Sequence, residues 1–209
     1  PDATNDDILN AIADIYGMNK NQIVVGNGAA ELLYAICRLP GYTGAFVPAP
    51  GFSEYKAALE ASRIPVRDIY YRPREDEHGK PYFEVPYLAL ETFAAELKGQ
   101  DGRIIVFLGN PNNPDGTLLD KNHIRTIASM LKDANSLLVI DESFIDFVGN
   151  DTLQDNEYSM RSLVNEFDNI IVVHSFTKFY AVPGLRIGAA FSNPLIIEQL
   201  NSFIPTWSV

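Results

Sequence analysis

Hydrophobic positions along the chain fall into short runs rich in Val and Ile, and between these runs apolar residues recur at spacings of three and four. The short runs are typical of buried strands, and the spacing between them is typical of amphipathic helices. Seven strands are predicted, at residues 22–25, 45–48, 67–71, 104–108, 137–141, 170–175 and 187–191. Six helices are predicted between them, at residues 5–16, 29–38, 53–62, 88–98, 121–132 and 159–167.

The last three predicted strands are apolar at nearly every position. A strand with one face in water alternates apolar and polar residues, so these three strands are expected to be covered on both faces. The pattern predicts an α/β fold of three layers, α/β/α, around a mostly parallel seven-stranded sheet. Residues 72–86 are charged and contain Pro and Gly, and they are interpreted as a long connection, with residues 149–158 a second polar loop. No repeat divides the chain, so residues 1–209 are expected to form one domain.

Composition narrows the classes of partner and compartment. Lys and Arg number 16 against 27 Asp and Glu, and the net charge of −11 disfavours nucleic acid and anionic membranes as main partners. No stretch reaches the length of about 18 apolar residues that crosses a bilayer. The one cysteine, Cys37, cannot form a disulfide within the chain, and we expect a cytoplasmic protein. The chain opens on Pro1 and ends without a polar tail, so we expect a piece of a longer protein, truncated at both ends.

Chemistry is expected where strands end, because open α/β sheets bind ligands beyond the carboxyl ends of their strands. Residues 26–31 (GNGAAE) follow a predicted strand and open a helix, so free backbone N–H groups there suit an anion such as a phosphate. A tight turn before a helix explains the same pattern equally well. A dinucleotide site matches poorly, because Glu31 stands where that fingerprint needs a third glycine.

Asp141 ends a predicted buried strand, as the magnesium-binding aspartate of a nucleotide hydrolase would. The phosphate loop that such an enzyme needs is missing, since the only Gly-Lys pair, at residues 79–80, is followed by Pro81. A buried carboxylate needs a cationic or hydrogen-bonded partner, and a protonated ring nitrogen would serve. Capping of nearby backbone is the alternative. No metal site is predicted, because no metal-ligand spacing relates the three histidines, His78, His123 and His174.

Lys178 follows another apolar strand directly, in a place where a lysine rarely lacks a partner. Its ammonium group can reach solvent, or it can be desolvated and attack a carbonyl to form a Schiff base. Ser175 lies three residues before it and Arg186 eight residues after it. A hydroxyl and a guanidinium near one lysine suit an aldehyde that carries a phosphate, and pyridoxal phosphate is such an aldehyde.

Four motifs together resemble those of the class I/II aminotransferase family of fold-type I pyridoxal-phosphate enzymes, over residues 26–209. They are residues 26–31, 110–116 (NPNNPDG), 141–142 (DE) and 175–178 (SFTK) with 184–186 (GLR). Within the family, the chain is most similar to threonine-phosphate decarboxylases at residues 141–147, 177–186 and 205–209, and histidinol-phosphate aminotransferases come next. The resemblance implies a pyridoxal 5'-phosphate cofactor, an amino acid or amino phosphate as substrate, and a homodimer.

The resemblance also implies roles for single residues. Lys178 is expected to attach the cofactor and move a proton at the substrate α-carbon, and Asp141 to pair with the pyridine nitrogen. Asn113 would hydrogen-bond the ring hydroxyl, and Phe52 would stack on the ring. Phe144 stands at the ring position where many relatives have Tyr. The residues expected to hold the phosphate are Gly28, Ala29, Ala30, Ser175, Thr177 and Arg186.

Some features of the family are expected to lie outside this sequence. The small C-terminal domain, with the arginine that grips the substrate carboxylate, has no counterpart, and neither has the tyrosine that relatives place before the Pro-Asp seen at residues 1–2. The 209 residues are therefore interpreted as the cofactor-binding large domain, poorly active by itself. A nucleotide-binding module and an inactive fragment that only dimerises are the other hypotheses.

Overall fold

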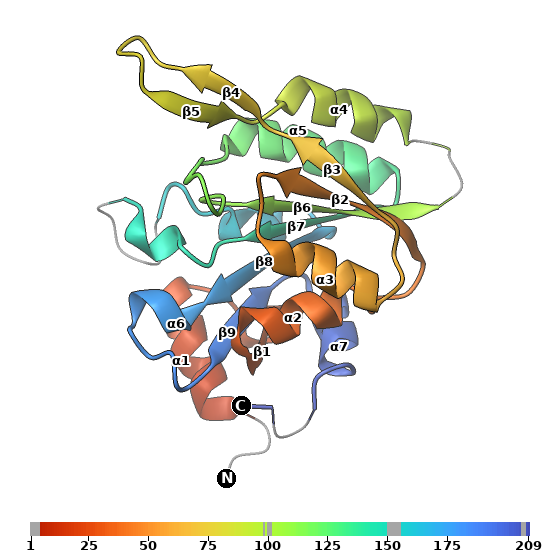
Figure 1. Cartoon of the computed structure of the whole chain (residues 1–209). Coiled ribbons are helices and arrows are strands. Elements are labelled where there is room, and N and C mark those ends of the chain that lie inside the picture. The colour runs from red at the N-terminus through yellow and green to blue at the C-terminus, as the bar shows by residue number, and fades with distance from the viewer. Residues whose placement is uncertain (1–4, 98, 100–101, 150–155, 206–207) are drawn as a thin grey trace.

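A seven-stranded sheet forms the centre of the computed structural model, which describes residues 5–97, 99, 102–149, 156–205 and 208–209 (Figure 1). Its strands are β1 (Ile23–Asn27), β2 (Tyr42–Ala49), β3 (Val66–Tyr70), β6 (Arg103–Gly109), β7 (Leu137–Asp141), β8 (Ile170–Ser175) and β9 (Ile187–Phe191). All seven predicted strands are present, and the bounds of the last three agree residue for residue with the prediction.

The strands lie in the order β1-β9-β8-β7-β6-β2-β3. Neighbouring strands from β8 to β3 are parallel, whereas β9 runs antiparallel to both of its neighbours, β1 and β8. The sheet is therefore mostly parallel, as predicted. One edge of the sheet collects the carboxyl ends of six strands together with the first residues of β9, and this edge is where an α/β sheet binds ligands.

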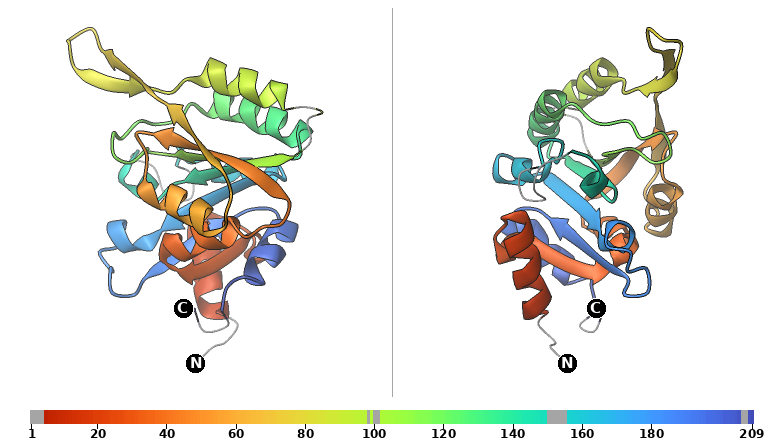
Figure 2. Two further views of the ribbon diagram at one scale, coloured as in Figure 1. Left: turned by 45° about the vertical axis from the view of Figure 1, so that its right-hand side comes forward. Right: turned by 90° about the vertical axis from the view of Figure 1, so that its left-hand side faces the viewer.

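Helices cover both faces of the sheet (Figure 2). One face packs against α1 (Asp6–Tyr16), α4 (Tyr87–Glu96) and α5 (Lys121–Asp133). The other face packs against α2 (Gly28–Ile36), α3 (Ser53–Ala61) and α7 (Pro194–Asn201). This arrangement confirms the three-layer α/β/α prediction.

Side chains of the central strands alternate between the two layers of core. In β6, Val106 and Leu108 pack on the α5 side, and Ile105 and Phe107 pack on the α3 side. Every residue of β7 and β8 is buried, which explains why their sequences are apolar without alternation. Each fully buried side chain of this size contributes about 1.5 to 3 kcal/mol, so the centre of the sheet is a stable support for groups at its edge.

The helix predicted at residues 159–167 is wrong in type, because the structure has a short 3-10 helix at Arg161–Asn165. Met160 and Leu163 are both buried, and the Leu163 N–H donates to the Met160 carbonyl over 2.9 Å. Apolar residues three apart share a face in a 3-10 helix as well as in an α-helix. In a segment of nine residues, the spacing of the apolar residues therefore does not distinguish the two kinds of helix.

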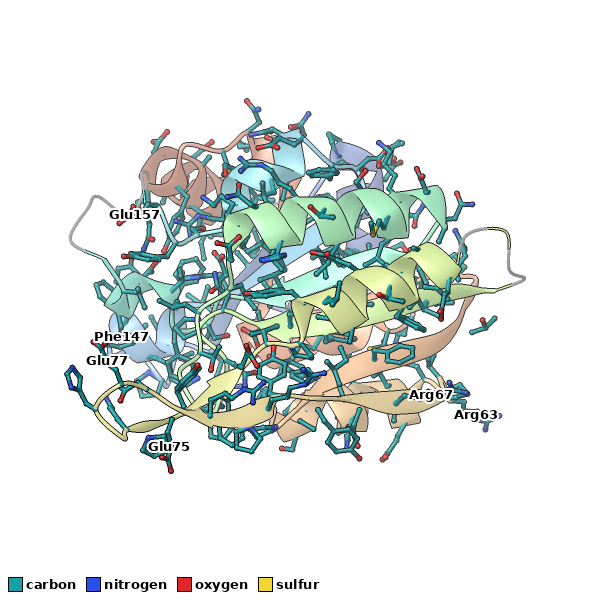
Figure 3. The ribbon with its side chains drawn as sticks, turned by 90° about the horizontal axis from the view of Figure 1, so that it is seen from above. Arg63, Arg67, Glu75, Glu77, Phe147 and Glu157 are labelled. Carbon is teal, nitrogen blue, oxygen red and sulfur yellow. The ribbon has the colours of Figure 1, made fainter. Side chains whose placement is uncertain are left out.

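The connection predicted at residues 72–86 contains a hairpin, formed by β4 (Arg72–Glu75) and β5 (Pro81–Glu84). The carboxylate of Asp76 accepts hydrogen bonds from the backbone N–H groups of His78 and Lys80 and so stabilises the turn. All four residues of β4 are exposed, so this strand has no buried face and its sequence has no hydrophobic pattern. Figure 3 shows Glu75 and Glu77 at the part of this hairpin that extends away from the body of the protein.

Two α-helices of the described residues were not predicted, α6 (Phe176–Phe179) and α7. The signal for α7 was present, because the Asn193 side chain accepts from the N–H groups of Leu195 and Ile196, and Pro194 occupies the first helical turn. α6 is a single turn directly after β8, too short to show a periodicity. Among the described residues, no helix has the length and apolar character needed to cross a bilayer.

Candidate active site

A pocket of about 150 Å3 opens at the carboxyl edge of the sheet. It brings together five of the residues that the sequence singled out, Phe52, Asn113, Asp141, Phe144 and Lys178. They come from loops and elements far apart in the chain, and they meet because β2, β6, β7 and β8 end at the same edge. Tyr55, Pro111 and Ser143 complete its lining.

Asp141 is the last residue of β7 and is buried. Its Oδ1 accepts from the Ser143 backbone N–H at 2.9 Å and from the Ser143 hydroxyl at 2.6 Å. Its Oδ2 accepts from the Tyr55 hydroxyl at 2.9 Å. Both carboxylate oxygens are therefore held by hydrogen bonds. Capping of nearby backbone, the alternative from the sequence, accounts only for the bond from the Ser143 N–H.

Tyr55 is a site residue that the sequence reading missed. Burial raises the pKa of Tyr55 well above its ordinary value, and the neighbouring Asp141 carboxylate raises it further, so the phenol keeps its proton and donates. Its ring stacks on Phe107 at 5.3 Å and meets Phe52 edge-on at 5.7 Å. Tyr55 thus joins the core, the predicted ring-stacking Phe52 and Asp141. Nothing in the sequence distinguished it from an ordinary core residue of a helix.

Lys178 lies in α6, and its Nζ stands 5.0 Å from the centre of the Phe144 ring. An ammonium over an aromatic face is attracted by it, which keeps the amine at the pocket. Lys178 is nevertheless exposed. Its side chain is open to solvent among the described residues. Of the two alternatives that the sequence left open, this structure therefore has the solvent-exposed lysine and not the desolvated one.

The loop that carries Asn113 is tied to its surroundings by its other asparagines. Asn112 Nδ2 donates to the Pro50 carbonyl at 3.0 Å and so connects this loop to the one that carries Phe52. Asn110 is fully buried, and its Nδ2 donates to Glu142 Oε1 at 3.1 Å. These bonds place Asn113 beside the pocket and explain why the motif contains several asparagines.

The remaining predicted residues gather beside the pocket, where β1, β9 and β8 meet. Because β9 is antiparallel, its first residues lie next to the last residues of β1 and β8, and Gly188 pairs with both Gly26 and Ser175. This register brings Arg186, which precedes β9, to the edge where the other strands end. The hydroxyls of Ser175 and Thr177 lie 2.8 Å apart.

Two glycines, Gly28 and Gly188, allow these groups to approach each other. A Cβ on Gly28 would lie 3.1 Å from Arg186 Nη2, so the guanidinium rests against the backbone that opens α2. Ala29 and Ala30 follow in the first turn of α2 and are half-buried. Arg186 has a φ of 51°, which is uncommon for a residue other than glycine.

The candidate site is not the largest hollow of the surface. A hollow of about 580 Å3 lies between the β4–β5 hairpin and α4, and another of about 570 Å3 lies between α4 and the strands β2 and β3. None of the residues predicted for the site lines either of them. The small pocket is distinguished by its chemistry, since it combines a buried carboxylate, an amine and aromatic walls.

The chain is similar to known proteins of one family. The family described as aminotransferase class I and II matches residues 1–209. The chain belongs to this family. The adenosylcobalamin biosynthesis bifunctional protein CobDQ of Leptospira interrogans is 34% identical, over 100% of this chain and 22% of its own length. Histidinol-phosphate aminotransferase 1 of Psychrobacter arcticus is 31% identical, over 96% of this chain and 48% of its own.

Among solved structures, the L-threonine-O-3-phosphate decarboxylase of Porphyromonas gingivalis superposes with a TM-score of 0.73 and 25% identity. It is matched over 100% of this chain and 55% of its own. The chain therefore spans about half the length of such relatives, and less of the bifunctional protein. The resemblance to the family and the predicted fold are confirmed, whereas the roles of the individual site residues stay predictions. Residues 206–207, which also carried the resemblance, and residues 1–2, before which relatives place a tyrosine, lie outside the described residues.

Proposed function

We propose that the chain is the cofactor-binding large domain of a pyridoxal-phosphate enzyme that acts at the α-carbon of an amino acid or amino phosphate. The observation that carries the proposal is the single pocket in which Lys178 and Asp141 stand with Phe52, Asn113 and Phe144. The preferred activity is decarboxylation of L-threonine O-3-phosphate. The similarity to a threonine-phosphate decarboxylase structure supports this choice, as do residues 141–147 and 177–186.

The residues present fit pyridoxal 5'-phosphate at both of its ends. The phosphate would be held by the N–H groups that open α2, the hydroxyls of Ser175 and Thr177, and the Arg186 guanidinium. The missing side chain of Gly28 leaves the space in which Arg186 approaches. Asp141, held by Tyr55 and Ser143, would face the pyridine nitrogen. The cofactor, when bound, supplies an electron sink for the bond that breaks at the α-carbon.

Each residue of the pocket would then have a distinct task. Lys178 would be the attachment point and would hold or move the proton at the substrate α-carbon. Phe52 would orient the ring by stacking, and Asn113 would donate to the ring hydroxyl. We further propose that the whole enzyme is a cytoplasmic homodimer with a small-molecule substrate, as the family resemblance implies.

A histidinol-phosphate aminotransferase is the second candidate, supported by the 31% identity to the Psychrobacter arcticus protein. The two activities share the pocket described above and differ in which bond breaks at the α-carbon. The full-length protein should be given L-threonine O-phosphate and, separately, histidinol phosphate with 2-oxoglutarate. Carbon dioxide from the first is expected. Glutamate from the second, without gas from the first, would favour the aminotransferase.

Cofactor attachment tests the proposal more directly. Pyridoxal phosphate added to the full-length protein should give the absorption band of a Schiff base, and borohydride should then fix the mass of the cofactor on Lys178. Peptide mass spectrometry locates the modified residue. Label on another residue, or none, would contradict the proposal and would favour a nucleotide-binding or inactive module instead.

Replacing Gly188 by alanine is expected to weaken pyridoxal-phosphate binding by at least about tenfold. The new Cβ would lie 2.5 Å from the Ala29 nitrogen and 2.6 Å from the Gly28 carbonyl carbon, so the start of α2 must move away from residue 188, which pairs with Ser175. Gly184→Ala is the matched control, because a Cβ there meets no atom within 4 Å. Equal dissociation constants for the two variants, measured by absorbance titration, would contradict the proposed phosphate position.

A further inference from the structure

A cluster of polar side chains lies behind α6, on the face of the sheet that α1 covers. It consists of Tyr16, Asp146, Arg161, His174 and Tyr180, and we call it the Tyr16 cluster. All of its members except Tyr180 are buried. None of them lines the pocket that contains Lys178 and Asp141.

The hydroxyl of Tyr16 is the centre of this cluster. It donates to Asp146 Oδ2 at 2.8 Å, and it lies 3.2 Å from His174 Nε2 and 3.4 Å from the Tyr180 hydroxyl. A phenol has one donor and two acceptor positions, so three neighbours use its full capacity. Burial pushes the pKa of Asp146 upward, but hydrogen bonds from His174 and Tyr16 and the charge of Arg161 leave it below its usual value. The carboxylate therefore stays ionised and remains a strong acceptor for Tyr16.

Two of the three neighbours of the Tyr16 hydroxyl flank the turn that carries Lys178. His174 lies in β8, four residues before Lys178, and Tyr180 lies two residues after it. Successive side chains of a strand point to opposite faces, so His174 faces α1 while Ser175 faces the phosphate-binding candidates. Phe176 adds to the contact, with its ring centre 6.1 Å from that of Tyr16.

The turn depends on such outside contacts. α6 has four residues, and a helix of one turn is not stable without tertiary contacts. Lys178 is exposed, so the position of its amine depends on the backbone that carries it. A hydroxyl that holds the chain both before and after this residue restricts that backbone more than a contact at one end would.

The ring of Tyr16 also connects to the residue that follows Asp141. The guanidinium carbon of Arg161 stands 4.3 Å from the centre of the Tyr16 ring. An Arg161 Nη1 atom lies 3.6 Å from Glu142 Oε2, and Glu142 is fully buried. Cation–π attraction strengthens when the groups are removed from water, as they are here. Tyr16 therefore contacts the residues that flank the Lys178 turn directly, and it is linked through Arg161 to Glu142, the residue after Asp141.

We propose that Tyr16 is a positioning residue of this site, which holds the Lys178 turn at both ends and thereby sets where the Lys178 amine stands relative to Asp141. The inference rests on the proposed function, in which Lys178 attaches the cofactor. It adds that a residue of α1, outside the pocket, determines how well that attachment occurs.

A double-mutant cycle between Tyr16 and Lys178 in the full-length protein tests this inference. Tyr16→Phe removes only the hydroxyl, and Lys178→Ala leaves the cofactor to bind without attachment. Tyr16→Phe should weaken pyridoxal-phosphate binding about tenfold when Lys178 is present and at most about twofold when it is replaced. Tyr71→Phe is the matched control, because Tyr71 is also buried and its hydroxyl has no hydrogen-bond partner among the described residues.

The outcomes separate positioning from a general structural role. A similar loss in both Lys178 backgrounds would overturn the inference, and so would a loss no greater than that of Tyr71→Phe. Thermal unfolding of the cofactor-free variants shows whether Tyr16→Phe still folds. If it does not, Tyr180→Phe, which removes a half-exposed partner of the same hydroxyl, should show the same dependence on Lys178. Failure of the wild-type protein to attach the cofactor at Lys178 would instead overturn the proposed function itself.

Discussion

Replacing Lys178 by alanine in the full-length protein is expected to lower turnover at least about 10³-fold. A positioned proton-transfer group alone contributes about 10² to 10⁴ in rate, and Lys178 would supply the covalent attachment as well. The variant should still bind pyridoxal phosphate, because the phosphate-binding candidates around Gly28, Ser175 and Arg186 are unchanged. Steady-state kinetics with the preferred substrate measure the loss, and an absorbance titration measures the binding.

Lys178→Arg is the informative companion to this variant. It keeps a positive charge near the Phe144 ring, but a guanidinium stays protonated and does not form a Schiff base. If the charge were all that mattered, the arginine variant would retain turnover close to that of the wild type, and the assigned role of Lys178 would be wrong. We expect both variants to be inactive to a similar degree.

The sheet could be predicted from the sequence because its centre is buried on both faces. Every residue of β7 and β8 lies in the core, so the apolar runs begin and end where the strands do. The same reasoning fails for β4, whose four residues are exposed, because a strand without a buried face has no hydrophobic pattern. It also fails for residues 161–165, where spacing does not separate a 3-10 helix from an α-helix.

The part of the pocket that consists of residues at strand ends could be predicted from the sequence. Asp141 and Lys178 stand at or just after the ends of buried strands, and residues in those positions meet at one edge. Arg186 precedes its strand, and only the antiparallel direction of β9 brings it to this edge. That direction is a property of the assembled sheet, so Arg186 was singled out by its distance of eight residues from Lys178 and by the family resemblance, and not by a strand end.

Side chains that support the pocket could not be predicted in this way. Tyr55 and Tyr16 are aromatic residues on the buried faces of helices. The sequence around each of them does not differ from that around an ordinary core residue. Their hydroxyls contact partners 86 and 130 residues away, Asp141 and Asp146. Such pairs depend on how α3 and α1 pack on the sheet, which no local pattern encodes.

Replacing Asp141 by asparagine is expected to lower turnover of the full-length protein about 10² to 10³-fold, the loss typical of removing one preorganised electrostatic contact. The amide has the size of the carboxylate, and its oxygen can still accept from Ser143 while its Nδ2 donates to the Tyr55 hydroxyl, so the fold and the attachment at Lys178 should persist. What is lost is the negative charge beside the pyridine nitrogen. Kinetics on the untreated variant, with attachment verified by borohydride on a separate sample, separate these two effects.

Two further variants, Tyr55→Phe and Asp168→Asn, serve as comparisons for Asp141→Asn. Loss of the Tyr55 hydroxyl removes one hydrogen bond to the charged Asp141 and should reduce turnover about tenfold, less than the loss of the charge itself. Asp168 is exposed and pairs with Lys132 on the surface, so its amide variant should turn over like the wild type. If Asp141→Asn matched the Asp168 variant in turnover, the carboxylate would be a structural cap, and the pairing with the ring nitrogen would have to be abandoned.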